Sequence, residues 1–149
     1  MFFLALCQCK GDAAIGFLCH YLNKKKMNTI EKELTIKEKI KDLNDLVISG
    51  RAMEAFEKYY HENVEMQEND NLPVVGKNAN RKREQEFFDN IEEFRKASVG
   101  AVATAGDVSF VVWSYDYTHR EWGVKNYTQV SVQRWKDGKI IHEQFFYKG

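Results

Sequence analysis

The feature that most constrains the fold is a change of hydrophobic period about two-thirds of the way along the 149-residue chain. Between residues 29 and 91, apart from a short stretch at 64–68, apolar side chains recur every three or four positions, which is typical of amphipathic helices. From residue 93 on, apolar and polar side chains alternate, as they do in strands with one buried face. Helices followed by strands favour an α+β architecture, in which the helices cover one face of a curved, mainly antiparallel sheet.

Three helices are expected in the first part of the chain. In residues 29–49 the apolar positions follow steps of four and three, and Asn28 or Thr29 can cap the start. Gly50 lies where a left-handed residue ends a helix. The other segments expected before the sheet are a helix from Arg51 to about Glu62, a strand at 64–68, a loop at 69–76 and a helix at 77–91.

Strands joined by tight turns are expected in the second part, which predicts an antiparallel meander. Asp137-Gly138 is a strong signal for a two-residue hairpin, because both residue types tolerate positive φ. The segment with the most β-branched and aromatic residues is 108–119. The expected strands cover residues 93–105, 108–119, 124–136 and 139–147.

Charge and hydropathy exclude several classes of protein. The chain has 22 basic and 22 acidic residues, so it lacks the net positive field that attracts nucleic acid or anionic lipid. No apolar run approaches the 18 residues that a membrane span needs. The locally basic stretch at 81–83 has glutamates at helical spacing, which is typical of a solvated helix face. We therefore expect neither a nucleic-acid partner nor a membrane partner.

The first 26 residues differ from the rest of the chain. They contain all three cysteines, Cys7, Cys9 and Cys19, and their lysine cluster follows the apolar stretch, the reverse of the order in a signal peptide. The cysteine spacing fits no common zinc pattern, so no metal is expected. We interpret residues 1–26 as a disordered leader or as a segment before a natural start at Met27, and residues 27–149 as one domain. Since that domain holds no cysteine, we expect a cytoplasmic protein.

Two stretches carry a family resemblance. The sequence FEKYYH at 56–61 follows two helices, and VQRWKDGKII at 132–141 forms the last hairpin. With the order of elements over residues 29–148, they resemble SnoaL-like proteins of the nuclear transport factor two-like superfamily. The resemblance implies a cone-shaped α+β fold around a pocket, and a homodimer formed through the open face of the sheet. Because that superfamily includes isomerases, cyclases, dehydratases and non-catalytic binders, it implies a small organic ligand but no particular reaction.

Alternation along residues 124–136 divides the strand into two faces. The resemblance implies that the face of Trp135 turns toward the cone. The alternative is that Val130 and Val132 on the other face are core, with the polar face meeting solvent or a dimer partner. The expected ligand-binding residues are Tyr60, Gln67, Trp113, Tyr127, Gln129, Ser131 and Trp135.

Asp116 and His61 are the candidate catalytic residues. Asp116 lies among aromatic residues, where desolvation raises the pKa of a carboxyl group toward a useful acid–base value, and we expect it on the pocket wall beside Gln129. The alternative is a carboxylate at a strand end or dimer contact. His61 is expected to end the second helix, where it serves the pocket or interacts with the helix dipole. His142 and Glu143 face opposite sides of the last strand, so only one of them can reach the cone.

The sequence therefore predicts a small-molecule-binding protein that needs no cofactor. If it is an enzyme, proton transfer on a carbonyl compound is expected, in an isomerisation, cyclisation or dehydration. Asp116 would then be the acid or base, while Tyr60, Tyr127 and Gln129 would polarise the carbonyl group. The alternative is a non-catalytic ligand-binding or dimerisation module.

Overall fold

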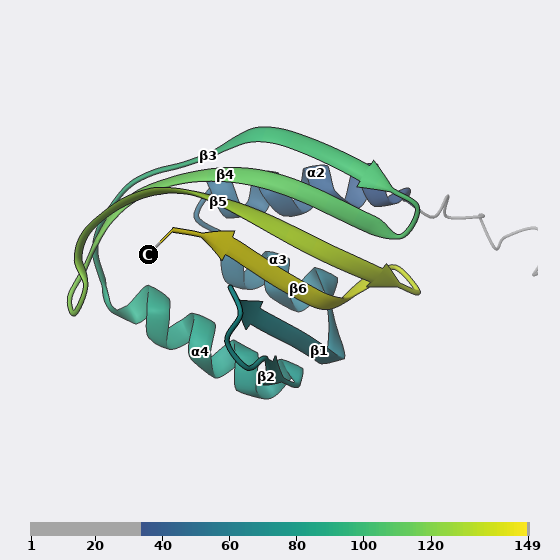
Figure 1. Ribbon diagram of the computed structural model, residues 1–149, viewed down its shortest axis with the longest axis horizontal. Helices are drawn as coiled ribbons and strands as arrows, with labels where there is room; N and C mark the ends of the chain where they lie inside the picture. Colours follow the sequence, from purple (N-terminus) through teal and green to yellow (C-terminus); the bar gives the residue numbers. More distant parts are fainter. Residues whose placement is uncertain (1–33, 149) are drawn as a thin grey trace, which may run out of the picture. The chain divides into compact units, whose positions relative to one another are not determined.

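The computed structural model describes residues 34–148, and their architecture is α+β (Figure 1). Any structure of the leader at 1–26, and of its cysteines, lies outside the described residues. None of the helices within residues 34–148 is long and apolar enough to cross a membrane. The elements are α2 (Ile36–Ile48), α3 (Ala52–Tyr59), β1 (Tyr60–Glu68), β2 (Val74–Val75), α4 (Lys77–Asp89), β3 (Ile91–Ala105), β4 (Val108–His119), β5 (Gly123–Lys136) and β6 (Lys139–Tyr147).

Helix α2 begins at Ile36 because Thr35 caps it. The Thr35 hydroxyl accepts a hydrogen bond from the backbone N–H of Glu38, and the Glu38 carboxylate accepts one from the N–H of Thr35. This reciprocal pair satisfies two backbone donors that a helix start leaves open. The expected caps, Asn28 and Thr29, lie outside the described residues. At the other end Gly50 has a φ of 77°, which confirms the left-handed residue predicted there.

The prediction that the second helix continues to Glu62 is wrong. Helix α3 ends at Tyr59, and Tyr60 is extended, with φ −94° and ψ 139°. Tyr60 and His61 therefore belong to β1, which follows the helix without a loop. The aromatic residues up to Tyr59 are helical, as their spacing predicts. Tyr60 instead lies in a strand, where it pairs with Ile140 of β6.

One six-stranded sheet, in the order β2-β1-β6-β5-β4-β3, forms the rest of the fold. Strands β1 and β6 run parallel and the other neighbours antiparallel, which confirms the predicted meander. The hairpin at Asp137-Gly138 has positive φ at both residues, as a two-residue turn of this type requires. The predicted loop at 69–76 contains the short edge strand β2.

The helices lie along one face of the curved sheet (Figure 1). Apolar side chains of α2 and α3, including Ile40, Leu43 and Phe56, pack against Val111, Trp113 and other residues of that face. At the far end of the sheet the β4–β5 hairpin meets the end of α4, where the N–H of Arg120 donates to the carbonyl oxygen of Asn90. The sheet and α4 therefore enclose a space beyond the core.

Asn80 holds the start of α4 against the edge of the sheet. Its fully buried side-chain amide donates to the carbonyl oxygens of Val64, Val74 and Gly76, at 3.4, 2.9 and 2.9 Å. These acceptors come from β1, from β2 and from the residue before α4. The amide nitrogen thus joins three elements by hydrogen bonds that only a donor can make.

We predict that Asn80→Asp lowers the free energy of unfolding by about 3 kcal/mol or more, because a carboxylate of the same shape meets three carbonyl oxygens that it cannot donate to. Urea unfolding at pH 7 measures the change. Asn78→Asp is the matched control: Asn78 is exposed on the same helix and accepts from Arg81, a role that Asp retains. Equal stability of the two variants would contradict this account of Asn80.

Candidate functional site

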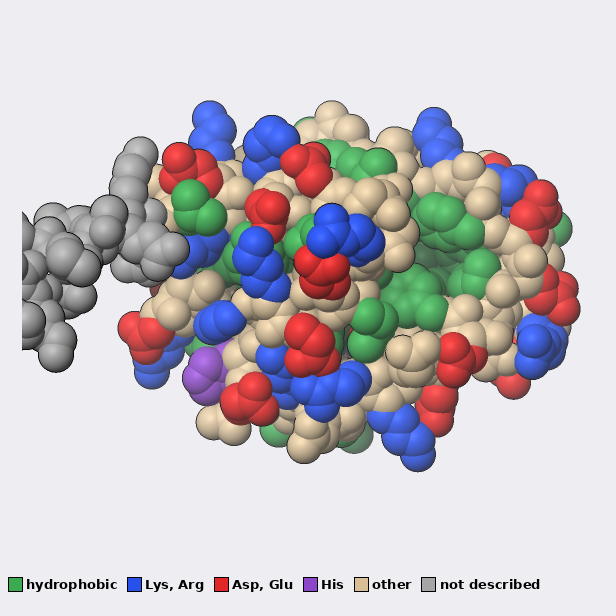
Figure 2. All heavy atoms as spheres, turned by 180° about the vertical axis from the view of Figure 1, so that it is seen from behind, with side chains coloured by type: hydrophobic (Ala, Val, Ile, Leu, Met, Phe, Trp, Pro, Cys, Tyr) green, Lys and Arg blue, Asp and Glu red, His purple; other side chains and the backbone are tan. Residues whose placement is uncertain are grey.

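A cavity of about 1300 Å³ lies between the concave face of the sheet and helices α3 and α4. Figure 2 shows the hollow, with hydrophobic side chains gathered inside it and acidic and basic side chains around its edge. Phe87 and Phe88 of α4 and Trp122 of the β4–β5 turn contribute to its lining. A cavity of this size holds a drug-sized organic molecule.

Aromatic side chains form the sheet side of the cavity. Trp113 and Tyr115 of β4 stack with ring centroids 5.5 Å apart. Tyr127 of β5 lies 5.8 Å from Tyr115 and 5.3 Å from Tyr147 of β6. Burial raises the pKa of Tyr115, Tyr127 and Tyr147, the last to about 12, so these phenols stay protonated near neutral pH. They offer flat apolar surface with a few O–H donors.

A row of buried polar side chains reaches the floor of the cavity at Gln133 and Glu143, which belong to its lining. Ser109, Gln133 and Glu143 are cross-strand neighbours on β4, β5 and β6, and each is at most 2 % exposed. The Ser109 hydroxyl donates to Oε1 of Gln133 at 2.8 Å, and Nε2 of Gln133 donates to Oε1 of Glu143 at 2.8 Å. The indole N–H of Trp135 donates to Ser109 at 2.8 Å.

Tyr60 approaches Glu143 from the helical side. Its hydroxyl donates to Oε2 of Glu143, and its ring stacks on Phe56 of α3 at 4.7 Å. Tyr60 and Gln133 thus give each carboxyl oxygen of Glu143 one hydrogen bond. Because a carboxylate oxygen has further lone pairs, both oxygens keep capacity for a ligand.

Glu143 is a buried acid with a raised pKa. Burial raises the pKa of Glu143 to about 7, and the hydrogen bonds from Tyr60 and Gln133 act in the opposite direction. The carboxylates of Glu84 and Glu68 raise it further. Glu143 can therefore give or take a proton near neutral pH, which is the requirement for a general acid or base.

Charged residues lie nearer the cavity mouth. Arg83 of α4 pairs with Glu84 at 3.0 Å and with Glu68 of β1 at 3.7 Å. Burial raises the pKa of Glu84, while Arg83 opposes the rise. The arginine is thus shared by two carboxylates of the lining, whereas the hydrogen-bond partners of Glu143 within residues 34–148 are the uncharged Tyr60 and Gln133.

The structure places most of the sequence-predicted binding residues at this cavity. Tyr60, Trp113, Tyr127, Gln129 and Ser131 belong to its lining. Trp135 lies on the same face of β5, buried beneath the floor, where it supports Ser109. Gln67 does not join them. It lies opposite Gln144 on the outer face, whereas its neighbour Met66 is buried on the inner one.

The two predicted catalytic residues lie elsewhere. Asp116 alternates with the inward-facing Tyr115 and Tyr117, so its side chain points to the outer face of the sheet, away from Gln129. There it forms an ion pair with Arg95 at 2.6 Å. His61 lies on β1, half-buried, with Nδ1 accepting from the N–H of Asn63 at 3.0 Å. Neither residue lines the cavity.

Sequence reasoning did not select Glu143, and a bulge explains why. A regular ladder from the Asp137-Gly138 turn would place His142 opposite Gln133. Instead Trp135 pairs with Ile140 and Arg134 with His142, so Ile141 is skipped and Glu143 lies opposite Gln133. In the sequence, Glu143 lies one residue beyond the position on β6 that a regular ladder would pair with Gln133. A carboxyl group so close to that position is the signal that could have identified it.

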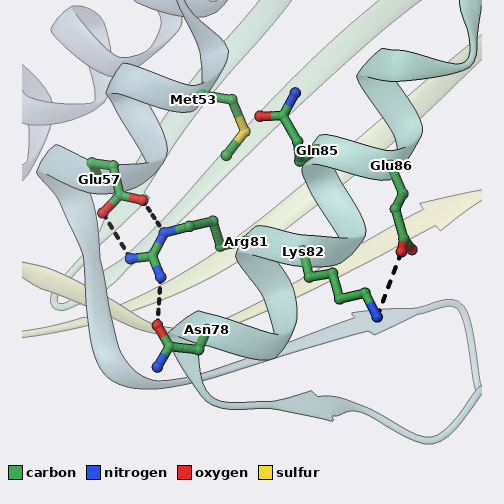
Figure 3. Close-up of a pocket in the computed structure, with 7 residues that line it drawn as sticks. All are labelled: Met53, Glu57, Asn78, Arg81, Lys82, Gln85 and Glu86. Atoms are coloured by element: carbon green, nitrogen blue, oxygen red, sulfur yellow. Dashed lines mark hydrogen bonds and ion pairs between the residues drawn. The ribbon is translucent and has the colours of Figure 1, made fainter.

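A second, shallower depression of about 510 Å³ lies between α3 and α4. Figure 3 shows Met53 and Glu57 of α3 facing side chains of α4. Arg81 donates to both carboxylate oxygens of Glu57 and also to Asn78. Since these charges satisfy one another and their side chains are exposed, the described residues of the depression include no buried carboxyl group comparable to Glu143.

Comparison with known proteins places the chain in a family. The family model of the SnoaL-like domain matches residues 24–147. The chain belongs to the SnoaL-like family. No curated protein matches its sequence. Within residues 34–148, the SnoaL-like domain has no cluster of three or more His, Cys, Asp or Glu side chains that could hold a metal ion.

Solved structures agree with this assignment. A Mesorhizobium loti protein assigned as a SnoaL-like polyketide cyclase is 29% identical, with a TM-score of 0.70 over 76% of this chain and 100% of that one. A Xanthomonas campestris protein with a cystatin-like fold is 12% identical, with a TM-score of 0.68 over 78% and 92%. A Catenulispora acidiphila protein with a ketosteroid isomerase-like fold, in complex with trimethylamine, is 13% identical, with a TM-score of 0.62 over 76% and 88%. The latter two show the shared fold alone.

We predict that Glu143 destabilises the SnoaL-like domain as pH rises. In the unfolded chain the carboxyl ionises near its ordinary pKa of 4.5, whereas in the folded protein it stays protonated up to about pH 7. Between these values the folded state binds more protons, so its contribution to the free energy of unfolding falls by about 3 kcal/mol. Urea unfolding of wild type and Glu143→Gln from pH 4.5 to 8 measures this difference. Parallel profiles would contradict it.

Proposed function

We propose that this SnoaL-like protein binds a small organic carbonyl compound in the 1300 Å³ cavity and transfers a proton on it through Glu143. The observation that carries the proposal is a carboxyl group 2 % exposed on the cavity floor, with hydrogen bonds from Tyr60 and Gln133. A general base of this kind removes a proton from the carbon next to the carbonyl group and returns it at another atom. That step serves isomerisation, cyclisation and dehydration alike.

The surroundings of Glu143 support this role. Glu143 is 2 % exposed beside apolar side chains, and the low local dielectric strengthens the electrostatic effect of each polar group there on a bound ligand. Gln129 and Tyr127 follow Gln133 along the inner face of β5 toward the mouth, and both line the cavity. We assign them to the carbonyl oxygen, where an amide N–H and a phenol O–H stabilise the charge of an enolate.

The aromatic wall indicates the class of substrate. Trp113, Tyr115, Tyr127 and Tyr147 present ring surface with centroid separations of 5.3–5.8 Å between neighbours. Such a surface favours a flat, largely apolar molecule over a compact ionic one. The polyketide cyclase assignment of the Mesorhizobium loti protein is consistent with that class. We keep the cytoplasm as the proposed compartment, because residues 27–149 contain no cysteine.

We predict that the protein catalyses ring opening of 5-nitrobenzisoxazole, a probe whose C–H proton is removed by a base as its N–O bond breaks to give a coloured phenolate. Glu143→Gln should lower kcat/KM by about 100-fold or more, the usual contribution of a general base. The wild-type rate should rise with pH through about 7 as Glu143 ionises. Absorbance of the phenolate measures both.

Asp116→Asn is the matched control, because it removes a carboxylate from the outer face of the same sheet. We expect it to leave kcat/KM unchanged. Wild-type activity that persists in Glu143→Gln, or that disappears in Asp116→Asn, would refute the proposal. Binding of the probe by wild type without any turnover would favour the alternative, a non-catalytic binding module.

We also propose that the outer face of the sheet pairs with a second copy of the chain. Phe110, Val112, Val130, Val132 and Phe146 are neighbours on β4, β5 and β6 by strand register. Phe110 is 37 % exposed and Phe146 is 42 % exposed, and the described helices lie on the opposite face (Figure 1). A contiguous apolar surface of this kind is typical of protein interfaces.

For this interface we predict that Phe110→Glu weakens self-association by about 30-fold or more, because a charge would be buried at the centre of the contact. Sedimentation equilibrium of the full chain measures the dissociation constant. Val75→Glu is the control, since Val75 is 60 % exposed on the edge strand β2, away from the proposed contact. A monomeric wild type would refute the pairing.

A further inference from the structure

We propose that Trp135, Ser109 and Gln133 are positioning residues that determine which oxygen of Glu143 carries the proton. The inference deepens the proposed function and rests on it for the use of that proton. Its basis is the direction of the hydrogen bonds along the polar row, which starts at a group that can only donate.

The direction is set at the indole of Trp135. An indole N–H donates and cannot accept, so Oγ of Ser109, 2.8 Å away, must accept. The indole itself is held in place: Trp135 is 3 % exposed, its backbone N–H donates to Asp107, and its ring meets the Tyr59 ring edge-on at 6.1 Å. The Ser109 hydroxyl keeps its own proton, and it donates that proton to Oε1 of Gln133, at 2.8 Å.

That bond fixes the amide of Gln133. With its oxygen toward Ser109, its NH₂ group faces Oε1 of Glu143, at 2.8 Å. An amide N–H donates only, so a proton on Oε1 would point at another hydrogen. Oε1 is therefore an obligatory acceptor, whether or not Glu143 is ionised.

The proton of Glu143 is consequently confined to Oε2. Its partner there is the hydroxyl of Tyr60, which can donate or accept. When Glu143 is ionised, Tyr60 donates to it. When Glu143 is protonated, Oε2–H donates to Tyr60, and the hydroxyl proton of Tyr60 turns away from Glu143. When Glu143 gains or loses a proton, the direction of its hydrogen bond with Tyr60 therefore reverses. Tyr60 also lines the cavity, so this change takes place next to the ligand site.

Other ionisable groups act on Glu143 without fixing the proton to one oxygen. The carboxylates of Glu68 on β1 and Glu84 on α4 raise its pKa through charge alone. Tyr115 on β4 is buried nearby and interacts with it electrostatically, without a hydrogen bond between the two among the described contacts. These groups alter the affinity for the proton, whereas the polar row alters its location.

Infrared difference titration of the full chain tests the inference, with the protonated carboxyl band of Glu143 assigned by its loss in Glu143→Gln. In Ser109→Ala the Gln133 amide loses its donor and can rotate, so its oxygen can accept from a proton on Oε1. The neutral acid gains a second form of similar stability, and doubling its population should raise the titration midpoint by about 0.3 pH unit. Trp135→Phe, which keeps an aromatic ring for packing, should raise it in the same direction.

Ser131→Ala is the matched control. Ser131 is 1 % exposed on the same sheet face and is hydrogen-bonded to Gln129, outside the row. We expect its titration midpoint to equal that of wild type. The inference would be overturned if the titration midpoint were unchanged in a folded Ser109→Ala or Trp135→Phe variant. An equal rise of the midpoint in Ser131→Ala would also overturn it.

The titration contains no substrate, so the two proposals fail in different ways. If the carboxyl band shifts as expected but the protein shows no turnover, the proposed function is overturned. The assignment of the proton to Oε2 then still stands. Turnover that depends on Glu143, with unchanged midpoints in both variants, overturns the assignment alone.

Discussion

The hydrogen bonds that Tyr60 and Gln133 donate to Glu143 are the interaction around which this interior is arranged. An unpaired carboxylate in apolar surroundings costs several kcal/mol or more, and the group would remain neutral without donors. Supplying those donors requires Gln133 to lie opposite Glu143 and requires Tyr60 to enter from the end of α3. The direct passage from helix to strand at Tyr59–Tyr60 is therefore part of the site as well as of the fold.

The sheet separates two kinds of surface by the direction of alternate side chains. Along β4, the inward Trp113, Tyr115 and Tyr117 line the cavity, while the outward Phe110 and Asp116 face away from it. The same strand thus supplies both an apolar wall for a ligand and an apolar patch for a partner. Toward the β4–β5 hairpin, this apolar patch is bordered by ion pairs such as Arg95–Asp116.

Much of this organisation could be predicted from the sequence. Strong alternation and the Asp-Gly turn gave the bounds of β4 and β6, because both signals are local. The inward face of β5 was predicted from the family resemblance, which implies that Trp135 turns toward the cone, together with a period of two. Residues placed by the resemblance and that period, such as Gln129 and Ser131, line the cavity.

The rest depends on contacts that no local pattern records. Asp116 was predicted to lie in the pocket because its neighbours in the sequence are aromatic. Adjacent side chains in a strand, however, point to opposite faces. The end of α3 is set by the pairing of Tyr60 with Ile140, eighty residues away. Glu143 faces inward because the ladder skips Ile141, and such a bulge leaves no mark in the spacing of side-chain types.

That bulge has an evolutionary consequence. Strand β6 carries a second set of side chains, His142, Gln144 and Phe146, one residue out of step with the inward set. If the extra residue were absorbed elsewhere in the hairpin, the same amino acids would present an imidazole to Gln133, with no substitution at all. Among hairpins that descend from a common ancestor, insertions and deletions can therefore change the chemistry of the floor as effectively as point mutations. Aligning such sequences by residue identity would miss the change, whereas aligning them by strand register would reveal it.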